Sequence, residues 1–110
     1  NMKLWIDDVR PAPEGYVWCK SVNEQIKVII KEEHSYYDPF DNYHPWNIIE
    51  LIDLDHDAGD FVNEGGDYIR ILDWLEETGR NYPIRIHSMN PVGRGNMRRI
   101  IRKNGWKEID

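Results

Sequence analysis

The sequence predicts an α/β domain built on a mainly parallel β-sheet, with helices on both faces of the sheet. Short apolar runs typical of buried strands alternate with stretches in which apolar residues recur at helical spacing. Polar residues follow several of the apolar runs directly, as they do where buried strands end at a surface. A chain of 110 residues has room for one hydrophobic core, so we expect residues 2–110 to form a single domain.

The composition is that of an ordinary globular protein, with 40% hydrophobic and 31% charged residues. No apolar run approaches the roughly 18 residues that span a bilayer, and no signal peptide is recognisable, so we expect a cytoplasmic protein without membrane association. Asn1 precedes Met2 and is interpreted as a scar of expression cloning. Cys19, the only cysteine, excludes an internal disulfide and a thiolate metal cluster, and we expect it in the core.

The charge is unevenly distributed along the chain. The net charge of -6 argues against binding to long duplex nucleic acid. From residue 84 onward, however, seven basic residues face only Glu108 and Asp110. These basic residues are Arg85, Arg94, Arg98, Arg99, Arg102, Lys103 and Lys107. They indicate either a surface that faces phosphate or simply a solvated helix face.

The beginning of the chain predicts two strands with an unusually short connection. The first strand is expected at residues 3–6 and is followed at once by Asp7 and Asp8. The second is expected at residues 16–20, after a link rich in proline. A crossover between parallel strands normally takes about a dozen residues or more. The first helix of a doubly wound fold should therefore be missing or reduced here.

The remaining elements continue the alternation. Ser21 and Glu24 form a capping box that opens a helix. A strand is predicted at 48–54, followed by a helix from about 68 to Gly79 and a strand at 84–86. A last helix, capped by Asn90 and opened by Pro91, is predicted to run to about 103, and an edge strand is predicted near 106–109.

Between the first helix and the next strand, residues 34–46 form an aromatic loop. Its prolines, Pro39 and Pro45, exclude a helix or a central strand. The aromatic residues are Tyr36, Tyr37, Phe40, Tyr43 and Trp46. Packing over the sheet edge, covering a site and stacking a base are the three interpretations that this composition allows.

Polar side chains are predicted to meet where the strands end. The carboxyl ends of parallel strands open into one crevice, and ligands bind there. The residues that fall in this crevice are Asp7, Asp8, Asp55, His56, Asp57, His87 and Ser88. Carboxylates placed together repel one another unless a cation neutralises them. We therefore expect a Mg²⁺ or Mn²⁺ site formed by Asp7, Asp8, Asp55 and Asp57, with Zn²⁺ less favoured because it would need His56 or His87.

Acidic residues at strand ends also cap helices and solvate turns, and for Asp57 alone this interpretation is the stronger one. For the convergence of Asp7, Asp8 and Asp55, a metal or phosphate site is favoured. His56 is open to three interpretations: a ligand, a base, or a side chain turned into the sheet.

Further residues are equipped to handle a phosphate. His87 can transfer a proton to a leaving oxygen and Ser88 can hydrogen-bond a phosphoryl group. The backbone N–H groups after Asn90 begin a helix and suit a phosphate, with Arg94 as a clamp. Arg10, in the loop after the acidic pair, is a third candidate for substrate binding.

The chain resembles the cyclic-phosphate-processing receiver domain family over most of residues 2–101. The resemblance is carried by four segments, LWIDDVRPAPEG, IDLDHDAG, GDYIRILDWLEE and IRIHSMNPVGRGNM. It implies a receiver-like (flavodoxin-like) three-layer sandwich with a reduced first helix. It also implies a role with cyclic phosphates, such as 2′,3′-cyclic phosphate RNA ends or cyclic nucleotides.

Several residues correspond to functional positions of receivers. By this resemblance Asp7 and Asp8 match the acidic pair that holds the metal, Asp55 matches the phosphate-accepting aspartate, and Ser88 matches the hydroxyl residue. The receiver lysine has no clear counterpart, because Lys107 precedes the end of the last strand.

We therefore expect a metal-dependent phosphoesterase that opens a cyclic phosphodiester, with catalysis by Asp55, His56, His87 and Ser88. Asp55 could act as a metal ligand or attack directly as a nucleophile. Two alternatives remain: a receiver-like signalling module phosphorylated on Asp55, and a non-catalytic binder of nucleotides or RNA ends. In each case the partner is a small molecule or RNA end that carries phosphate.

Overall fold

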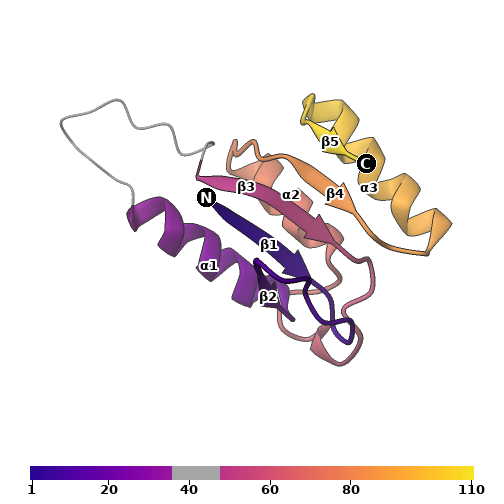
Figure 1. Cartoon of the computed structure of the whole chain (residues 1–110). Coiled ribbons are helices and arrows are strands. Elements are labelled where there is room, and N and C mark those ends of the chain that lie inside the picture. The colour runs from indigo at the N-terminus through magenta and orange to yellow at the C-terminus, as the bar shows by residue number, and fades with distance from the viewer. Residues whose placement is uncertain (36–47) are drawn as a thin grey trace.

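The computed structural model describes residues 1–35 and 48–110 and contains the predicted alternation of strands and helices (Figure 1). The strands are β1 (Met2–Ile6), β2 (Tyr16–Cys19), β3 (Ile49–Leu54), β4 (Ile84–Ile86) and β5 (Glu108–Ile109). The helices are α1 (Val22–Ser35), α2 (Ile69–Glu77), α3 (Pro91–Asn104) and a short 3-10 helix, η2 (Gly59–Phe61). The predicted boundaries agree with these elements to within two residues.

The sheet has the strand order β2-β1-β3-β4-β5, and all neighbouring strands are parallel. This order and the parallel pairing confirm the predicted α/β, receiver-like fold class. The link between β1 and β2 contains no helix, so the predicted loss of the first helix is also confirmed. The first two residues of the predicted aromatic loop at 34–46 instead belong to the last turn of α1, and the rest of that loop lies outside the described residues, which resume at Ile48.

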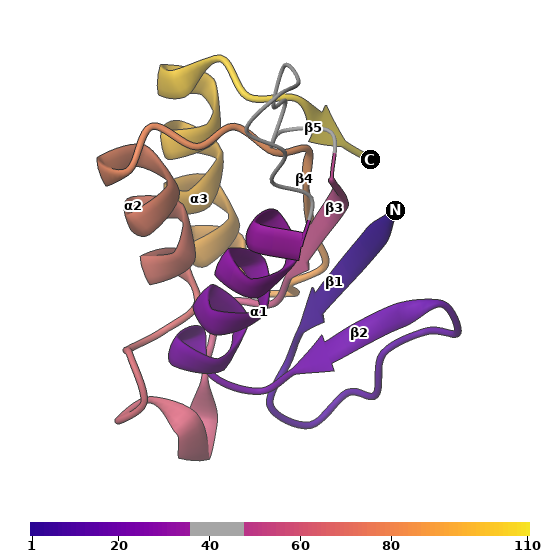
Figure 2. The same cartoon turned by 90° about the vertical axis from the view of Figure 1, so that its left-hand side faces the viewer.

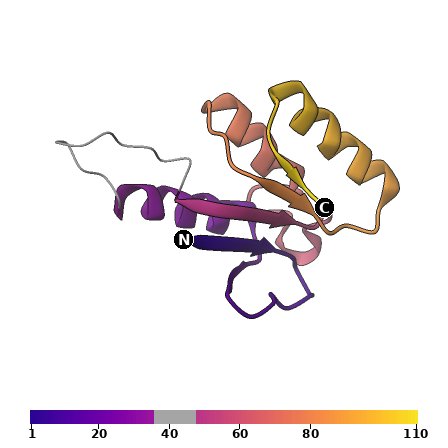
Figure 3. The same ribbon diagram turned by 45° about the horizontal axis from the view of Figure 1, so that its top comes forward.

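In one respect the layering differs from the expectation of helices on both faces. In the described residues α1, α2 and α3 all lie on the same face of the sheet (Figures 2 and 3). The reason is that the three helical crossovers run in the same direction across the sheet, and crossovers between parallel strands are right-handed. The connection that runs the other way, from β1 to β2, is the one without a helix.

The helix-covered face holds the hydrophobic core. Leu4, Ile6, Ile52, Leu54 and the other inward residues of the strands pack against apolar residues of all three helices. Cys19 belongs to this core, and burial raises the pKa of its thiol to about 12. The thiol is therefore a small packing group rather than a reactive one, as predicted.

The opposite face carries a different set of side chains. Registered residues of parallel neighbours share a face, which places Trp5 beside Trp18 and Asp53, and Asp53 beside Arg85. Trp5 is 6% exposed; its ring meets Tyr16 edge to face, and its Nε1 donates to the carbonyl of Arg10 in the β1–β2 loop. The β1–β2 loop thus covers part of the face that lacks helices.

The helix ends follow the capping signals in the sequence. In α1, Ser21 Oγ accepts from the Glu24 N–H, and Glu24 accepts from the Lys20 N–H. In α3, the side chain of Asn90 accepts from the Gly93 N–H, and Gly105 ends the helix with a φ of 67°. The Asn90 cap determines that α3 begins at Pro91, shortly after the end of β4.

A buried ion pair connects α1 to the segment that leads into β4. The Glu33 carboxylate accepts from Arg80 Nε at 2.9 Å and Nη2 at 2.8 Å, and also from the Tyr82 hydroxyl. Burial of Glu33 opposes its ionisation, but the hydrogen bonds from Arg80 and Tyr82 outweigh burial and hold the pKa of Glu33 below its ordinary value of 4.5. The ion pair therefore stabilises the fold while Glu33 is ionised.

Across residues 1–35 and 48–110, none of the helices combines the length and apolar character that crossing a membrane requires.

Glu33→Gln is expected to destabilise the protein by about 3 kcal/mol at neutral pH, because it removes the buried charge that accepts hydrogen bonds from Arg80 and Tyr82. Glu33 has a lowered pKa, so the stabilisation is complete above the ordinary value of 4.5 and is lost as the pH falls through the lower folded value. The difference between the two proteins should therefore shrink below that range.

Urea unfolding at pH 7 and at pH 3 measures both effects. Glu14→Gln, at an exposed loop position, is the matched control and should behave like the unmodified chain at both pH values. An equal difference between Glu33→Gln and the unmodified chain at both pH values would contradict the assignment.

Candidate functional site

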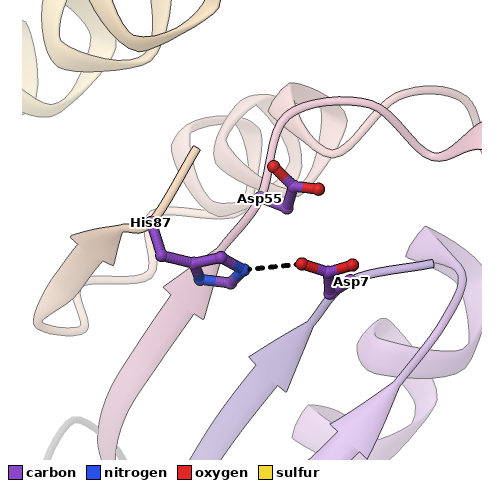
Figure 4. Close-up of side chains that lie close together, drawn as sticks. All are labelled: Asp7, Asp55 and His87. Carbon is purple, nitrogen blue, oxygen red and sulfur yellow. Dashed lines mark hydrogen bonds and ion pairs between the residues drawn. The ribbon is translucent and has the colours of Figure 1, made fainter. Parts of the chain in front are cut away.

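Three side chains meet at the carboxyl edge of the sheet, one from each of three adjacent strand ends (Figure 4). Asp7 follows β1, Asp55 follows β3 and His87 follows β4. Backbone hydrogen bonds extend the ladder past the strands, from Asp55 N to the carbonyl of Ile6 at 3.0 Å and from His87 N to the carbonyl of Leu54 at 2.8 Å. The atoms with which Asp7, Asp55 and His87 could ligate a metal lie within 4.8 Å of one another, so the predicted convergence of these strand ends is present.

Asp7 is held by its own loop. Its Oδ1 accepts from the N–H groups of Val9 at 3.0 Å and Arg10 at 2.8 Å, and Trp18 Nε1 donates to its carbonyl. Burial opposes ionisation of Asp7, but the hydrogen bonds from Arg10, Val9 and His87 outweigh burial and lower the pKa of the carboxyl. Asp7 is therefore a fixed and ionised carboxylate.

His87 is held on three sides. Its Nε2 lies 3.0 Å from Asp7 Oδ2, and its Nδ1 lies 2.7 Å from Asp53 Oδ1. The ring stacks on Trp5, with 3.7 Å between the centroids and 4° between the planes. A ring that carries a proton on each nitrogen would donate to a carboxylate on both sides. These contacts leave the imidazole one orientation.

Asp53 was not among the residues predicted for the site. It is fully buried within β3, its Oδ1 faces His87, and its Oδ2 has no hydrogen-bond partner among the described residues. Arg85 Nη1 lies 3.6 Å from Oδ2, which is too far for a hydrogen bond. A charged residue is rarely fully buried without a partner, so the position of Asp53 inside an apolar strand was the sequence signal that could have predicted its role. A carboxylate on one nitrogen of a histidine orients the other nitrogen, as it does around metal-binding histidines.

Asp55 has the least favourable electrostatic environment in the cluster. Burial raises the pKa of Asp55, and the charges of Asp7 and Asp8 raise it further, against the opposing effects of a backbone hydrogen bond and of His87. A cation bound between Asp7 and Asp55 would relieve this repulsion. The two carboxylates offer the oxygen ligands that Mg²⁺ and Mn²⁺ prefer, so the residues present fit the expected metal, and His87 lies beside them.

Three other predicted residues lie around this cluster rather than within it. Asp8 is half-buried against Gly59 of η2, and its charge acts on Asp55. Asp57 is exposed and bonds to Nδ1 of His56 at 2.9 Å. The His56 ring packs over Gly93 in the first turn of α3, so it is not turned into the sheet.

The residues predicted to hold phosphate have structural contacts of their own. Ser88 is buried, and its Oγ accepts from the N–H of Asn90 at 3.1 Å. Arg94 Nη1 donates to the carbonyls of Ile86 at 3.2 Å and Ser88 at 2.9 Å, so Arg94 braces the turn that carries His87. Arg10 has an exposed side chain at the edge of the site.

The comparisons with known proteins agree with this picture. The sequence profile of the cyclic-phosphate processing receiver domain matches residues 2–103. No curated protein and no solved structure matches the chain significantly.

Asp53→Asn is expected to lower the affinity of the cluster for Mn²⁺ by roughly ten- to a hundredfold. The amide removes the charge that orients His87, and His87 in turn hydrogen-bonds Asp7, one of the two carboxylates that would hold the metal. The shape of the amide preserves the buried packing of β3. Calorimetric titration with Mn²⁺ measures the effect, and circular dichroism checks the fold. Asp60→Asn, an equal charge change at an exposed position of η2, is the control and should bind as the unmodified chain does. An unchanged affinity in Asp53→Asn would show that Asp53 does not support the site.

Gly93→Ala is expected to displace His56, because a Cβ at this position would overlap ring atoms Cδ2 and Cγ of His56. The overlap should cost about 1 to 3 kcal/mol of stability unless the ring moves. The ring resonances of His56 in an NMR spectrum should shift. Gly95→Ala is the control, since its Cβ would meet nothing within 4 Å. Equal effects of the two substitutions would refute the close packing of His56 on α3.

Proposed function

The chain belongs to the family of cyclic-phosphate processing receiver domains, and on this basis we propose that it is a metal-dependent phosphoesterase that opens cyclic phosphodiesters. The substrates we propose are 2′,3′-cyclic phosphates, at RNA ends or in cyclic nucleotides. The observation that supports this proposal best is the convergence of Asp7, Asp55 and His87, with ligating atoms within 4.8 Å of one another.

The two carboxylates are the proposed holders of the metal. Asp7 is kept ionised by its loop, and Asp55 gains most from a neighbouring cation because burial and like charges raise its pKa. When bound, Mg²⁺ or Mn²⁺ would polarise a phosphoryl oxygen and activate water for attack. Oxygen ligands favour these ions over Zn²⁺, for which His87 would have to be a ligand.

In this proposal, His87 and Asp55 transfer the protons. In ring opening, a water oxygen bonds to phosphorus and the bond from phosphorus to one ribose oxygen breaks. His87 donates a proton from Nε2 to the ribose oxygen that leaves, and Asp55 accepts the proton that the water loses. Asp53 holds Nδ1 of His87 at 2.7 Å and Trp5 holds the face of its ring, so Nε2 stays directed toward Asp7 and the reacting group.

Phosphorelay signalling is the weaker explanation of the same cluster. Its support is the position of Asp55 at the end of β3, where receivers accept a phosphoryl group. Against it, Lys107 comes before β5 begins, whereas the cluster lies beyond the strand ends, and the Ser88 hydroxyl is buried and bonded to Asn90. His87 instead stands between Asp7 and Asp53, where a proton-transfer group is useful.

Metal-dependent ring opening is the test. The protein should convert adenosine 2′,3′-cyclic phosphate and RNA with a 2′,3′-cyclic phosphate end to monoesters when Mg²⁺ or Mn²⁺ is present, and a chelator should abolish the conversion. Asp55→Asn should reduce the rate on the order of a hundredfold or more. Product formation is followed by chromatography.

Asp60→Asn removes an equal charge from an exposed position and should retain the full rate. Binding of these ligands without turnover, unaffected by chelation, would favour a non-catalytic binder instead. A covalent adduct on Asp55 after incubation with a small phosphodonor, together with no ring opening, would favour the signalling module.

A further inference from the structure

A pocket of about 370 Å³ lies beside the cluster and is lined by residues of β4, α3 and β5. Figure 1 shows these three elements next to one another. Three arginines line it, Arg85 from β4 and Arg94 and Arg98 from α3, together with His87. Its acidic residues are Glu108 and Asp110. His87 therefore belongs both to the acidic cluster and to this pocket, which makes the two sites neighbours.

The arginines are only partly engaged in contacts with the described residues. Arg94 uses Nη1 for two backbone carbonyls, and Arg98 donates from Nε to Glu108 at 2.9 Å. Arg85 has a side chain that is 44% exposed and reaches Asp53 only at 3.6 Å. A guanidinium has five N–H donors, so each of the three arginines has further donors available for an anion.

The charge along the pocket wall also favours an anion. The lining carries three guanidinium groups and the carboxylates of Glu108 and Asp110. Glu108 is paired with Arg98, and Arg85 lies 3.6 Å from the buried carboxylate of Asp53, which is outside the lining. Arg99 and Arg102, by contrast, are exposed on α3 and are absent from the lining. The basic residues near the C-terminal end therefore divide into a solvated group and a group gathered around the pocket.

We propose that this pocket is a second anion site that binds a second phosphate of the substrate whose cyclic phosphate lies at Asp7, Asp55 and His87. The guanidinium fork matches phosphate oxygens, and several arginines can share one phosphate. The inference rests on the proposed function for the identity of the first phosphate. It makes the preferred substrate a nucleotide or RNA end with a second phosphate on the same ribose, rather than a cyclic phosphate alone.

The test measures binding without turnover. Calorimetric titration compares adenosine 3′,5′-bisphosphate with adenosine 3′-monophosphate, neither of which contains a ring to open, in the presence of Mn²⁺. The bisphosphate should bind roughly tenfold more tightly, since a hydrogen bond between charged groups changes affinity by about that factor. Arg98→Gln and Arg85→Gln should each remove most of this preference.

The variants are chosen so that the fold is preserved. Arg98→Gln keeps a donor for Glu108, and Arg85→Gln changes a side chain that is largely outside the core. Arg99→Gln removes the same charge from the neighbouring, exposed position and should keep the full preference.

Equal affinities of the two nucleotides for the unmodified chain would overturn the proposal. So would a preference that survives in both Arg85→Gln and Arg98→Gln, or one that Arg99→Gln removes equally. These outcomes are independent of catalysis. If the preference is present but no cyclic phosphate is opened, the anion site stands and the proposed enzymatic function fails.

Discussion

His87 is held between two carboxylates, Asp53 at Nδ1 and Asp7 at Nε2, while the Trp5 ring lies against its face. These side chains stabilise one another's positions. A fully buried carboxylate such as Asp53 is costly without a hydrogen-bonded partner, and His87 is the partner that the structure provides. A stacked ring that is fixed at both nitrogens has no other rotamer that keeps all three contacts. The proposed proton transfer depends on where this ring presents Nε2.

The parallel sheet makes this arrangement possible. Trp5 and Asp53 are registered neighbours on β1 and β3, and the hydrogen bond from His87 N to Leu54 continues the pairing of β3 with β4. The side chains that support the ring therefore come from strand interiors, and the side chains that would meet a ligand come from strand ends. The residues that position His87 and the residues that would contact a ligand therefore lie within a few positions of one another on three adjacent strands.

Much of this was accessible from the sequence. The alternation of apolar runs and helical patterns predicts the fold, because burial imposes a period on strands and helices alike. The polar residues after those runs predict Asp7, Asp55 and His87, because parallel strands end at a common edge. What a strand end carries can be deduced locally.

The support of the site could not be deduced in this way. Asp53 lies inside a strand, and its direction depends on which face the helices leave uncovered. The His56 ring packs against α3 because Gly93 has no side chain in its way. This contact joins residues 37 positions apart in the sequence. Arg94 donates from Nη1 to the carbonyls of Ile86 and Ser88, and the positions of these carbonyls depend on the turn after β4. Each of these facts is a property of the packed chain rather than of a pattern.

The placement of all three helices on one face has a consequence for how this protein can change. Here Trp5 and Asp53 lie on the side without helices and also touch the His87 imidazole. A substitution of Trp5 or Asp53 would change the packing of that side and the position of His87 together, so the two properties must evolve together.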